Sequence, residues 1–236
     1  MDRGDESKEL LDFFYDLYKL NRFIYVRGNH EDLFLEMIRR GAGMSHDLSN
    51  GTVKTLGNLC DPKWSEETTL WLFDEAAEKY DKRFLELIKN SVNYYEIGNY
   101  IFVHGWIPFN EFIFGKYEYD PNWRNASNAL WADARWANGM LAASQGVIEP
   151  NKTIVCGHWH TSWANVRKLD NIPFKDFTKV SARKYREKEF DENADVKTLF
   201  GIFREKGIIA LDACTAHSLF CNCLHLTEEE LYKETV

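Results

Sequence analysis

The chain has 236 residues, of which 44% are hydrophobic and 15% aromatic, and its formal charge is -8 because 37 Asp and Glu outnumber 29 Lys and Arg. This composition excludes an intrinsically disordered protein and supplies enough apolar side chains for one substantial core. The negative charge argues against a protein that binds nucleic acid through its overall field. We therefore predict a single folded domain over residues 1–236.

The cysteines and the hydropathy indicate where such a protein would work. The five cysteines are odd in number and unevenly spaced, which argues against the disulfide framework of a small secreted domain. No apolar run approaches the roughly 18 residues of a membrane span, and the chain begins with the charged stretch 1–6. These features predict a soluble protein of the reducing cytoplasm, with no membrane partner.

The first part of the chain alternates helical and extended patterns. Apolar residues recur at helical spacing from Glu6 to Leu20 and again from Leu33 to Arg40, which predicts two amphipathic helices. Between them, Phe23–Val26 is short, aromatic and β-branched, as in a buried strand. Ser65 is a good N-cap, and the periodicity after it predicts a third helix that ends near residue 90.

Further strand patterns follow in the second part. Tyr100–Val103 and Thr153–Cys156 resemble the first predicted strand, and each ends at a Gly/His pair. The charged segment Asn165–Asn193 has no clean period and is predicted to be a surface excursion. The ranges Gly207–Leu211 and Ser218–Leu226 are predicted to close the sheet as a pair of strands.

Residues that can bind metals follow all three predicted buried strands. Asn29 and His30 come after the first strand and His104 after the second, and His158 and His160 follow the third. Ligand sites in open α/β sheets lie beyond the carboxyl ends of the strands, so these side chains are expected to converge. A lone histidine is more often a hydrogen-bonded structural residue. Together they predict a site for two ions of Mn, Fe or Zn, the usual device for cleaving phosphoesters.

Four short strings carry a resemblance to a known family. DRG at 2–4, RGNHE at 27–31, VHG at 103–105 and GHWH at 157–160 occur in this order. They resemble the motifs of calcineurin-like metallophosphoesterases, and the branch they resemble most is that of the serine/threonine phosphoprotein phosphatases, whose second motif reads GDxxDRG. The segment Leu130–Asp133 more weakly resembles that branch's Leu-Trp-Ser-Asp.

The resemblance implies a role for each metal-binding residue. One metal would take the side chains of Asn29, His104 and His158, and the other would take His160. The family acts by in-line attack of a hydroxide that bridges the two metals, without a covalent intermediate. The substrate would be a phosphorylated protein or a small-molecule phosphoester.

Further residues are implied around the substrate. By the resemblance, His30 would protonate the leaving group, Asp2 would orient the His30 ring, and Arg3 would hold the phosphate. Arg135 is a candidate second phosphate contact, and a surface or packing role is an equal alternative for it. Cys214, His217, Cys221, Cys223 and His225 fit no common zinc finger, and alternation along strands explains them more simply.

The implied fold is an α/β/β/α sandwich, here without its first one or two strands. The family's DxH motif and the bridging Asp of GDxxDRG would lie before residue 2, which predicts an N-terminally incomplete enzyme with weak metal binding and little activity. The second histidine of GHWH, where the phosphoprotein phosphatase branch has Thr, departs from that branch.

Two alternatives stay open. One is a hydrolase of diadenosine polyphosphates or of other nucleotides, within the same family. The other is a catalytically inactive module that keeps the fold and binds at most about one metal ion, where catalysis requires two.

Overall fold

The computed structural model describes residues 3–113, 115–180, 182–190 and 195–233. The chain divides into two compact units, Met1–Val92 and Asn93–Val236. The prediction of a single domain over 1–236 stays a prediction. Within the described ranges, no helix is both long and apolar enough to cross a membrane.

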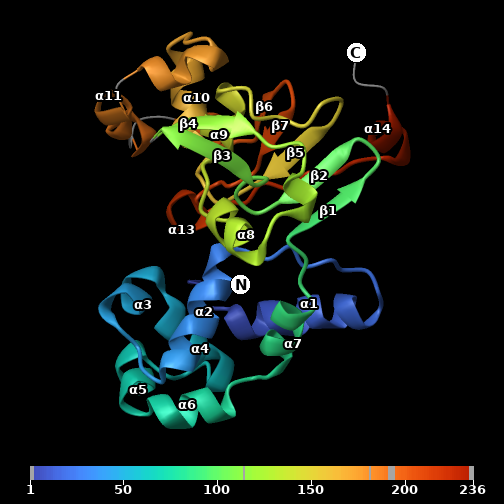
Figure 1. The fold of residues 1–236 in the computed structure, drawn as a ribbon. Coiled ribbons are helices and arrows are strands. Elements are labelled where there is room, and N and C mark those ends of the chain that lie inside the picture. The colour runs from blue at the N-terminus through green and yellow to red at the C-terminus, as the bar shows by residue number, and fades with distance from the viewer. Residues whose placement is uncertain (1–2, 114, 181, 191–194, 234–236) are drawn as a thin grey trace. The chain divides into compact units, whose positions relative to one another are not determined.

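The first unit is helical. Its elements are α1 (Ser7–Lys19), α2 (Asn29–Arg40), α3 (Ser45–Asn50), α4 (Thr52–Cys60), α5 (Glu66–Trp71), α6 (Phe73–Lys79) and α7 (Arg83–Lys89) (Figure 1). Their apolar faces enclose a core in which the Phe34 ring meets those of Tyr80 and Phe84 edge-on. The helices predicted near residues 6–20 and 33–40 are present, although α2 begins four residues earlier, directly after Gly28.

Two sequence predictions for this unit were wrong. The range Phe23–Val26 forms no strand; a single parallel bridge joins Val26 to Val92, and Ile24 is 47% exposed. One pair of bridged residues cannot bury the segment on two faces, as a central strand requires. The long helix predicted from Ser65 is three short helices, because the backbone leaves helical geometry at Leu72 and again at Tyr80.

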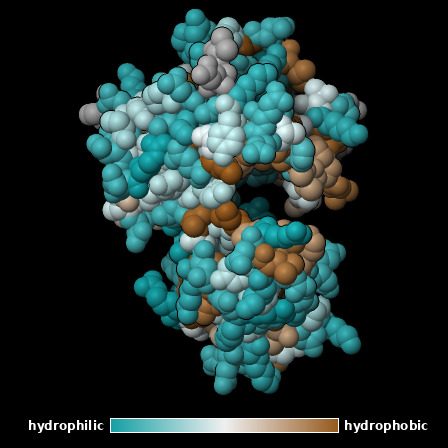
Figure 2. Space-filling model, turned by 90° about the vertical axis from the view of Figure 1, so that its right-hand side faces the viewer, coloured by the Kyte–Doolittle hydropathy of each residue, from teal (hydrophilic) through white to brown (hydrophobic). Residues whose placement is uncertain are grey.

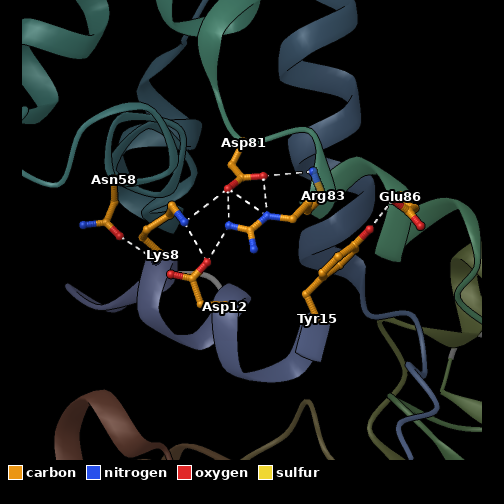
Figure 3. Close-up of polar contacts among 7 residues, drawn as sticks. All are labelled: Lys8, Asp12, Tyr15, Asn58, Asp81, Arg83 and Glu86. Carbon is orange, nitrogen blue, oxygen red and sulfur yellow. Dashed lines mark hydrogen bonds and ion pairs between the residues drawn. The ribbon is translucent and has the colours of Figure 1, made fainter. Parts of the chain in front are cut away.

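A network of ion pairs links α1 to the start of α7 (Figure 3). Arg83 Nη2 lies 2.6 Å from Asp81 Oδ2 and 2.5 Å from Asp12 Oδ1, and Lys8 Nζ lies 2.7 Å from the same oxygen of Asp12. The hydrogen bonds that Arg83 donates are the main cause that lowers the pKa of Asp81 to about 2. Charge therefore contributes to the contact between α1 and α7.

The second unit is built on a five-stranded mixed sheet of order β1-β2-β5-β7-β6 (Figure 1). The strands are β1 (Tyr94–Ile97), β2 (Tyr100–Val103), β5 (Thr153–Cys156), β6 (Phe203–Glu205) and β7 (Ile208–Ala210). The three inner strands are parallel, and each edge strand is antiparallel to its neighbour. A separate hairpin pairs β3 (Phe109–Ile113) with β4 (Lys116–Tyr119).

Helices flank this sheet. They are α8 (Asn128–Ala134), α9 (Gly139–Ser144), α10 (Ser162–Leu169), α11 (Ala182–Arg186), α12 (Val196–Phe200), α13 (Thr215–Ser218) and α14 (Glu228–Tyr232), with 3-10 turns η1 (Trp123–Asn125), η2 (Phe174–Lys179) and η3 (Lys188–Phe190). Successive side chains of β5 point to opposite faces, and Ile154, Val155 and Cys156 are all buried. Both faces of the central strand are therefore covered, as in a parallel sheet of an α/β protein.

Two predictions for the second unit need correction. The closing hairpin consists of β6 and β7, because Gly207 (φ +81°) turns the chain before β7, whereas Ser218–Leu226 has no strand. The charged segment Asn165–Asn193 is only in part a surface excursion. Its described residues include helical turns, and the side chains of Phe177 and Tyr185 are almost fully buried.

The molecular surface agrees with the composition. The face seen in Figure 2 is mostly hydrophilic, with separate hydrophobic patches. Several large apolar side chains are exposed, among them Trp71 (82%), Trp136 (50%) and Trp159 (41%). Single exposed apolar residues are ordinary in soluble proteins. They indicate a binding surface only where neighbouring residues also point to one.

Candidate metal centre and active site

Two of the predicted ligands follow neighbouring parallel strands. His104 comes directly after β2, and His158 comes two residues after β5. The register pairs Phe102 with Val155, so both strands end at the same edge of the sheet. The N–H of Gly157 donates to the carbonyl oxygen of His104 over 2.8 Å and ties the two turns together. The backbone therefore places the two imidazoles side by side, with ring centroids 5.1 Å apart.

This separation suits two ligands of one ion. A ring nitrogen binds Zn at about 2.1 Å, which places each ring centroid about 3 Å from the ion, so at a tetrahedral angle the two centroids would lie about 5 Å apart. The imidazoles of His104 and His158 meet that distance. Imidazole is also a suitable donor for Mn, Fe or Zn. The distance between the two imidazoles and their chemistry therefore fit two ligands of a single metal ion.

His158 has an unusual backbone. Its φ is +64°, a left-handed conformation that few residues other than glycine adopt. The N–H of Trp159 donates to the carbonyl oxygen of Gly157 over 2.8 Å, which closes a tight turn around His158. Such strain persists only where the surroundings fix it, and it is commonly found at functional sites. Here it accompanies the placement of the His158 ring beside His104.

The segment after His158 is fixed to the end of β7. Thr161 is fully buried, and its N–H and hydroxyl both donate to the carbonyl oxygen of Asp212, over 2.8 Å and 3.2 Å. His160 lies one residue before this anchor, and its carbonyl oxygen accepts from the N–H of Trp163. Across the part of the chain that the structure describes, no three His, Cys, Asp or Glu side chains are grouped as a metal site. The role of His160 as a ligand stays a prediction.

Arg135 is buried, unlike a freely exposed phosphate clamp. It is 7% exposed, and its Nη1 donates to Oδ1 of Asn93 over 2.9 Å. It follows α8, whose last residue Ala134 accepts a hydrogen bond from the N–H of Trp106 over 3.0 Å. A Cβ on Gly105 would lie only 2.4 Å from the same Ala134 oxygen, so only glycine permits this approach. The two roles that the sequence left open for Arg135, phosphate contact and packing, stay predictions.

In the first unit, Asn29 and His30 are the first two residues of α2. Glu31, which sequence reasoning passed over, explains why the helix starts there. One oxygen of its carboxylate accepts from the N–H of Gly28 over 2.7 Å, and the other accepts from the Tyr25 hydroxyl over 2.6 Å. Glu31 is only 5% exposed. Its carboxylate thus satisfies a donor at the helix start and fixes the position of the two predicted site residues.

Arg3 and His30, the predicted phosphate-binding group and proton donor, lie together. Arg3 Nη2 is 3.3 Å from His30 Nε2, and Arg3 Nε donates to the carbonyl oxygen of Asn50. The backbone of Arg3 (φ +72°) packs on Gly51, where a Cβ would lie 2.9 Å from the Arg3 Cα. Asp2, the predicted partner of the His30 ring, lies outside the described residues.

The structure also places two residues near the histidines that the sequence did not single out. The ring of Trp136 lies 5.6 Å from that of His158, nearly perpendicular to it, and Trp159 Nε1 donates to the carbonyl oxygen of Trp136 over 3.4 Å. Tryptophan more often builds the core than binds a ligand, so the sequence pattern gave neither indole a role. The position of Trp159 between two candidate ligands was the one signal in the sequence that set it apart.

The remaining candidates are cysteines. Burial raises the pKa of the Cys156 thiol far above its usual range, which argues against a reactive thiolate. Cys214, Cys221 and Cys223 are free thiols, and the latter two are exposed. Among the described residues of this segment, no three His, Cys, Asp or Glu side chains are grouped.

The family model of calcineurin-like phosphoesterases matches residues 1–171. The chain therefore belongs to this family of metal-dependent phosphoesterases, and its mixed sheet flanked by helices is consistent with the family's fold. No curated protein and no solved structure gives a significant match.

Proposed function

We propose that this chain provides the metal-binding and substrate-binding residues of a phosphomonoester hydrolase. The observation that carries the proposal is the 5.1 Å pair of His104 and His158 at the carboxyl ends of adjacent parallel strands. The Arg3 and His30 pair supplies the two other functions that such an enzyme requires, a cation for the phosphate and an acid for the leaving group. Family membership supports the same reaction class.

The donor set predicted for the metals consists of His104, His158 and His160 with the amide oxygen of Asn29. When bound, two divalent ions would supply Lewis acidity and lower the pKa of water for attack on phosphorus. In the reaction, the water oxygen forms a bond to phosphorus while the bond from phosphorus to the ester oxygen breaks. His30 gives its proton to that departing oxygen, so an alcohol and inorganic phosphate leave. Arg3 neutralises charge on the phosphoryl oxygens through its guanidinium.

The strings DRG, RGNHE and VHG support a phosphomonoesterase of the serine/threonine phosphatase type within the family. The second histidine of GHWH and the exposed indoles beside His158 support the competing nucleotide hydrolase. The two differ in what surrounds the phosphate, because a phosphoprotein presents a flexible peptide and a nucleotide presents a rigid base.

The test combines metal content with activity. We expect the protein to bind two Mn²⁺ ions and to hydrolyse 4-nitrophenyl phosphate. Calorimetry with Mn²⁺ and an assay of released 4-nitrophenol measure both. Binding of one ion or none, without turnover, would support the inactive module instead.

A further inference from the structure

The first unit has a hollow that the proposed reaction does not use. Its volume is about 470 Å³, and it is lined by the loop 41–43 between α2 and α3 and by residues 70–75, where α5 passes into α6 (Figure 1). A volume of this size is typical of pockets that bind a ligand. None of the lining residues has a predicted role at the metal centre, so the hollow is a candidate for a separate binding function.

The backbone fixes the shape of this hollow. The loop 41–43 passes close to α5, because a Cβ on Gly43 would lie only 2.7 Å from Cδ2 of Leu70. At Leu72 the chain leaves helical geometry, with φ -109° and ψ 34°. The N–H of Leu72 donates to the carbonyl oxygen of Thr68 over 3.0 Å, and its own carbonyl oxygen accepts from the N–H of Ala76 over 2.8 Å. The break between α5 and α6 is therefore a hydrogen-bonded part of the fold.

The packing of α5 determines which of its side chains are exposed. Thr69 is fully buried, and it lies so close to Gly57 of α4 that a Cβ there has no room. Trp71 comes two residues later, roughly 200° further around the helix, and so lies on the opposite face. Trp71 is 82% exposed, and Glu67, one turn earlier on the same face, is exposed as well. The outer face of α5 thus carries an indole and a carboxylate together.

The segments that form the hollow also carry other exposed apolar side chains. Leu72 is 40% exposed, and Met44, which directly follows the loop 41–43, is 48% exposed. Aromatic residues and methionine are enriched where proteins bind one another, and tryptophan often contributes a large share of the binding energy. Three such side chains on two short segments that border one hollow differ from single exposed apolar residues. This surface has the composition of a protein interface.

The charge around the hollow indicates what kind of partner fits. The lining includes the carboxylates of Asp74 and Glu75 and no Lys, Arg or His side chain. Glu75 pairs with Lys79 over 2.6 Å, whereas Asp74 is exposed and forms no ion pair with the residues that the structure describes. A basic side chain is attracted both by a carboxylate and by the face of an indole. An anionic ligand would instead meet two like charges.

We propose that this hollow is the docking site for a segment of a partner protein in which an arginine or lysine stands beside a large apolar side chain. The apolar side chain fits the hollow, whose lining includes Leu70 and Phe73. The basic side chain binds the carboxylate of Asp74 and the exposed indole of Trp71. The proposed reaction does not depend on this interaction, and the interaction does not depend on the metals.

Four matched peptides test the docking site. Each is a short fluorescein-labelled Gly/Ser peptide, and the central residues are Arg-Leu-Trp-Arg, Glu-Leu-Trp-Glu, Arg-Ser-Ser-Arg or Ser-Leu-Trp-Ser. Binding to the full chain is measured by fluorescence anisotropy in the presence of EDTA. We expect Arg-Leu-Trp-Arg to bind at least about tenfold more tightly than Glu-Leu-Trp-Glu or Arg-Ser-Ser-Arg. Its advantage over Ser-Leu-Trp-Ser should shrink as NaCl rises from about 50 to about 500 mM, because salt screens exposed charges.

Variants of two exposed residues locate the binding. Trp71→Ser is expected to weaken binding of the Arg-Leu-Trp-Arg peptide by at least about tenfold, and Asp74→Asn by about twofold to fivefold. The matched controls are Leu219→Ser, at an 87% exposed apolar position of the other unit, and Asp16→Asn, at an exposed carboxylate of α1; neither should change the affinity. Because Trp71 and Asp74 are exposed, urea unfolding of both variants should match that of the unsubstituted protein.

Several results would overturn the proposal. These are equal affinity for the Arg-Leu-Trp-Arg and Glu-Leu-Trp-Glu peptides, no binding of the former at about millimolar concentration, or an affinity that neither Trp71→Ser nor Asp74→Asn changes. If 2-phenylethylamine binds as tightly as the peptide, the hollow is a site for a small apolar amine instead. If the protein sediments as a dimer that Trp71→Ser dissociates, the occupant is a second copy of the chain.

Discussion

The two units hold their candidate site residues by different kinds of contact. In the second unit, backbone hydrogen bonds and tight glycine turns place His104 and His158 at the ends of paired strands. In the first unit, the Glu31 carboxylate fixes the start of α2, where Asn29 and His30 lie, and elsewhere in this unit an ion-pair network joins α1 to α7. A site held by backbone contacts is sensitive to added volume, and a site held by charged side chains is sensitive to their protonation.

The largest expected difference lies between His104→Ala and His30→Ala, one from each unit. Loss of a direct ligand at position 104 should weaken Mn²⁺ binding by more than the roughly 10–100-fold typical of outer-sphere changes. His30→Ala should leave metal content nearly intact and lower kcat by about 10²–10⁴-fold on a phosphoserine peptide, with a smaller loss on 4-nitrophenyl phosphate. The metal content and the two rates are measured on each variant and on the unsubstituted protein.

His225→Ala is the control for the histidine variants, because His225 is exposed and carries no predicted role at the metal centre. Equal rate losses on both substrates, or loss of metal in His30→Ala, would remove His30 from leaving-group protonation. Retention of full Mn²⁺ affinity in His104→Ala would show that the strand-end pair is structural.

A second difference is expected between two glycines of the strand-end turns. In Gly105→Ala the new Cβ would meet the carbonyl oxygens of Ala134 and Arg135 at 2.4 Å and 2.7 Å, and backbone atoms cannot rotate away. We expect a loss of about 2 kcal/mol or more in the free energy of unfolding. In Gly157→Ala the nearest contact is the His104 oxygen at 3.7 Å, so the loss should stay below about 1 kcal/mol. Urea unfolding followed by tryptophan fluorescence measures both, and equal losses would contradict the backbone account of this turn.

The strands of the second unit were predicted from the sequence more accurately than the structure of the first unit, for physical reasons. Patterns before His104 and His158 identified β2 and β5 correctly, because central parallel strands are continuously apolar. The same pattern at Phe23–Val26 failed, since a strand also requires partners, and only Val92 bridges that segment. The sequence also did not show that Glu31 caps α2, because Glu at a third helical position suits both a cap and a solvated face.

Prediction of the candidate site from the sequence was limited in the same way, by contacts between distant parts of the chain. Strand ends can be predicted from the sequence, which is how His104 and His158 were identified as candidates. The exposure of Trp136 and Trp159 could not be predicted, because a tryptophan in a rich aromatic composition is ordinarily core material. Exposure depends on where α8 ends relative to the turn after β2, and that contact is long-range.

The smallest expected effect concerns pH and the ion-pair network of the first unit. The folded pKa of Asp81 is about 2, below its ordinary value, chiefly because Arg83 donates hydrogen bonds to its carboxylate. A depressed carboxyl pKa means that the unfolded chain takes up the proton first as the pH falls. The stabilisation is therefore fully present above about pH 4 to 5 and is lost as the pH drops toward 2.

Asp81→Asn should cost on the order of 1–2 kcal/mol at pH 7, and the difference from the unsubstituted protein should shrink steadily below pH 4. Urea unfolding at a series of pH values measures the change in stability. The exchange of the amide hydrogens of α1 and α7 serves as the signal, so the result reports on the first unit. Asp74→Asn, at an exposed position of α6, is the control and should show no such trend. If the cost of Asp81→Asn is the same at pH 3 and pH 7, the carboxylate charge does not hold α1 to α7, and the contrast between the two units would rest on packing alone.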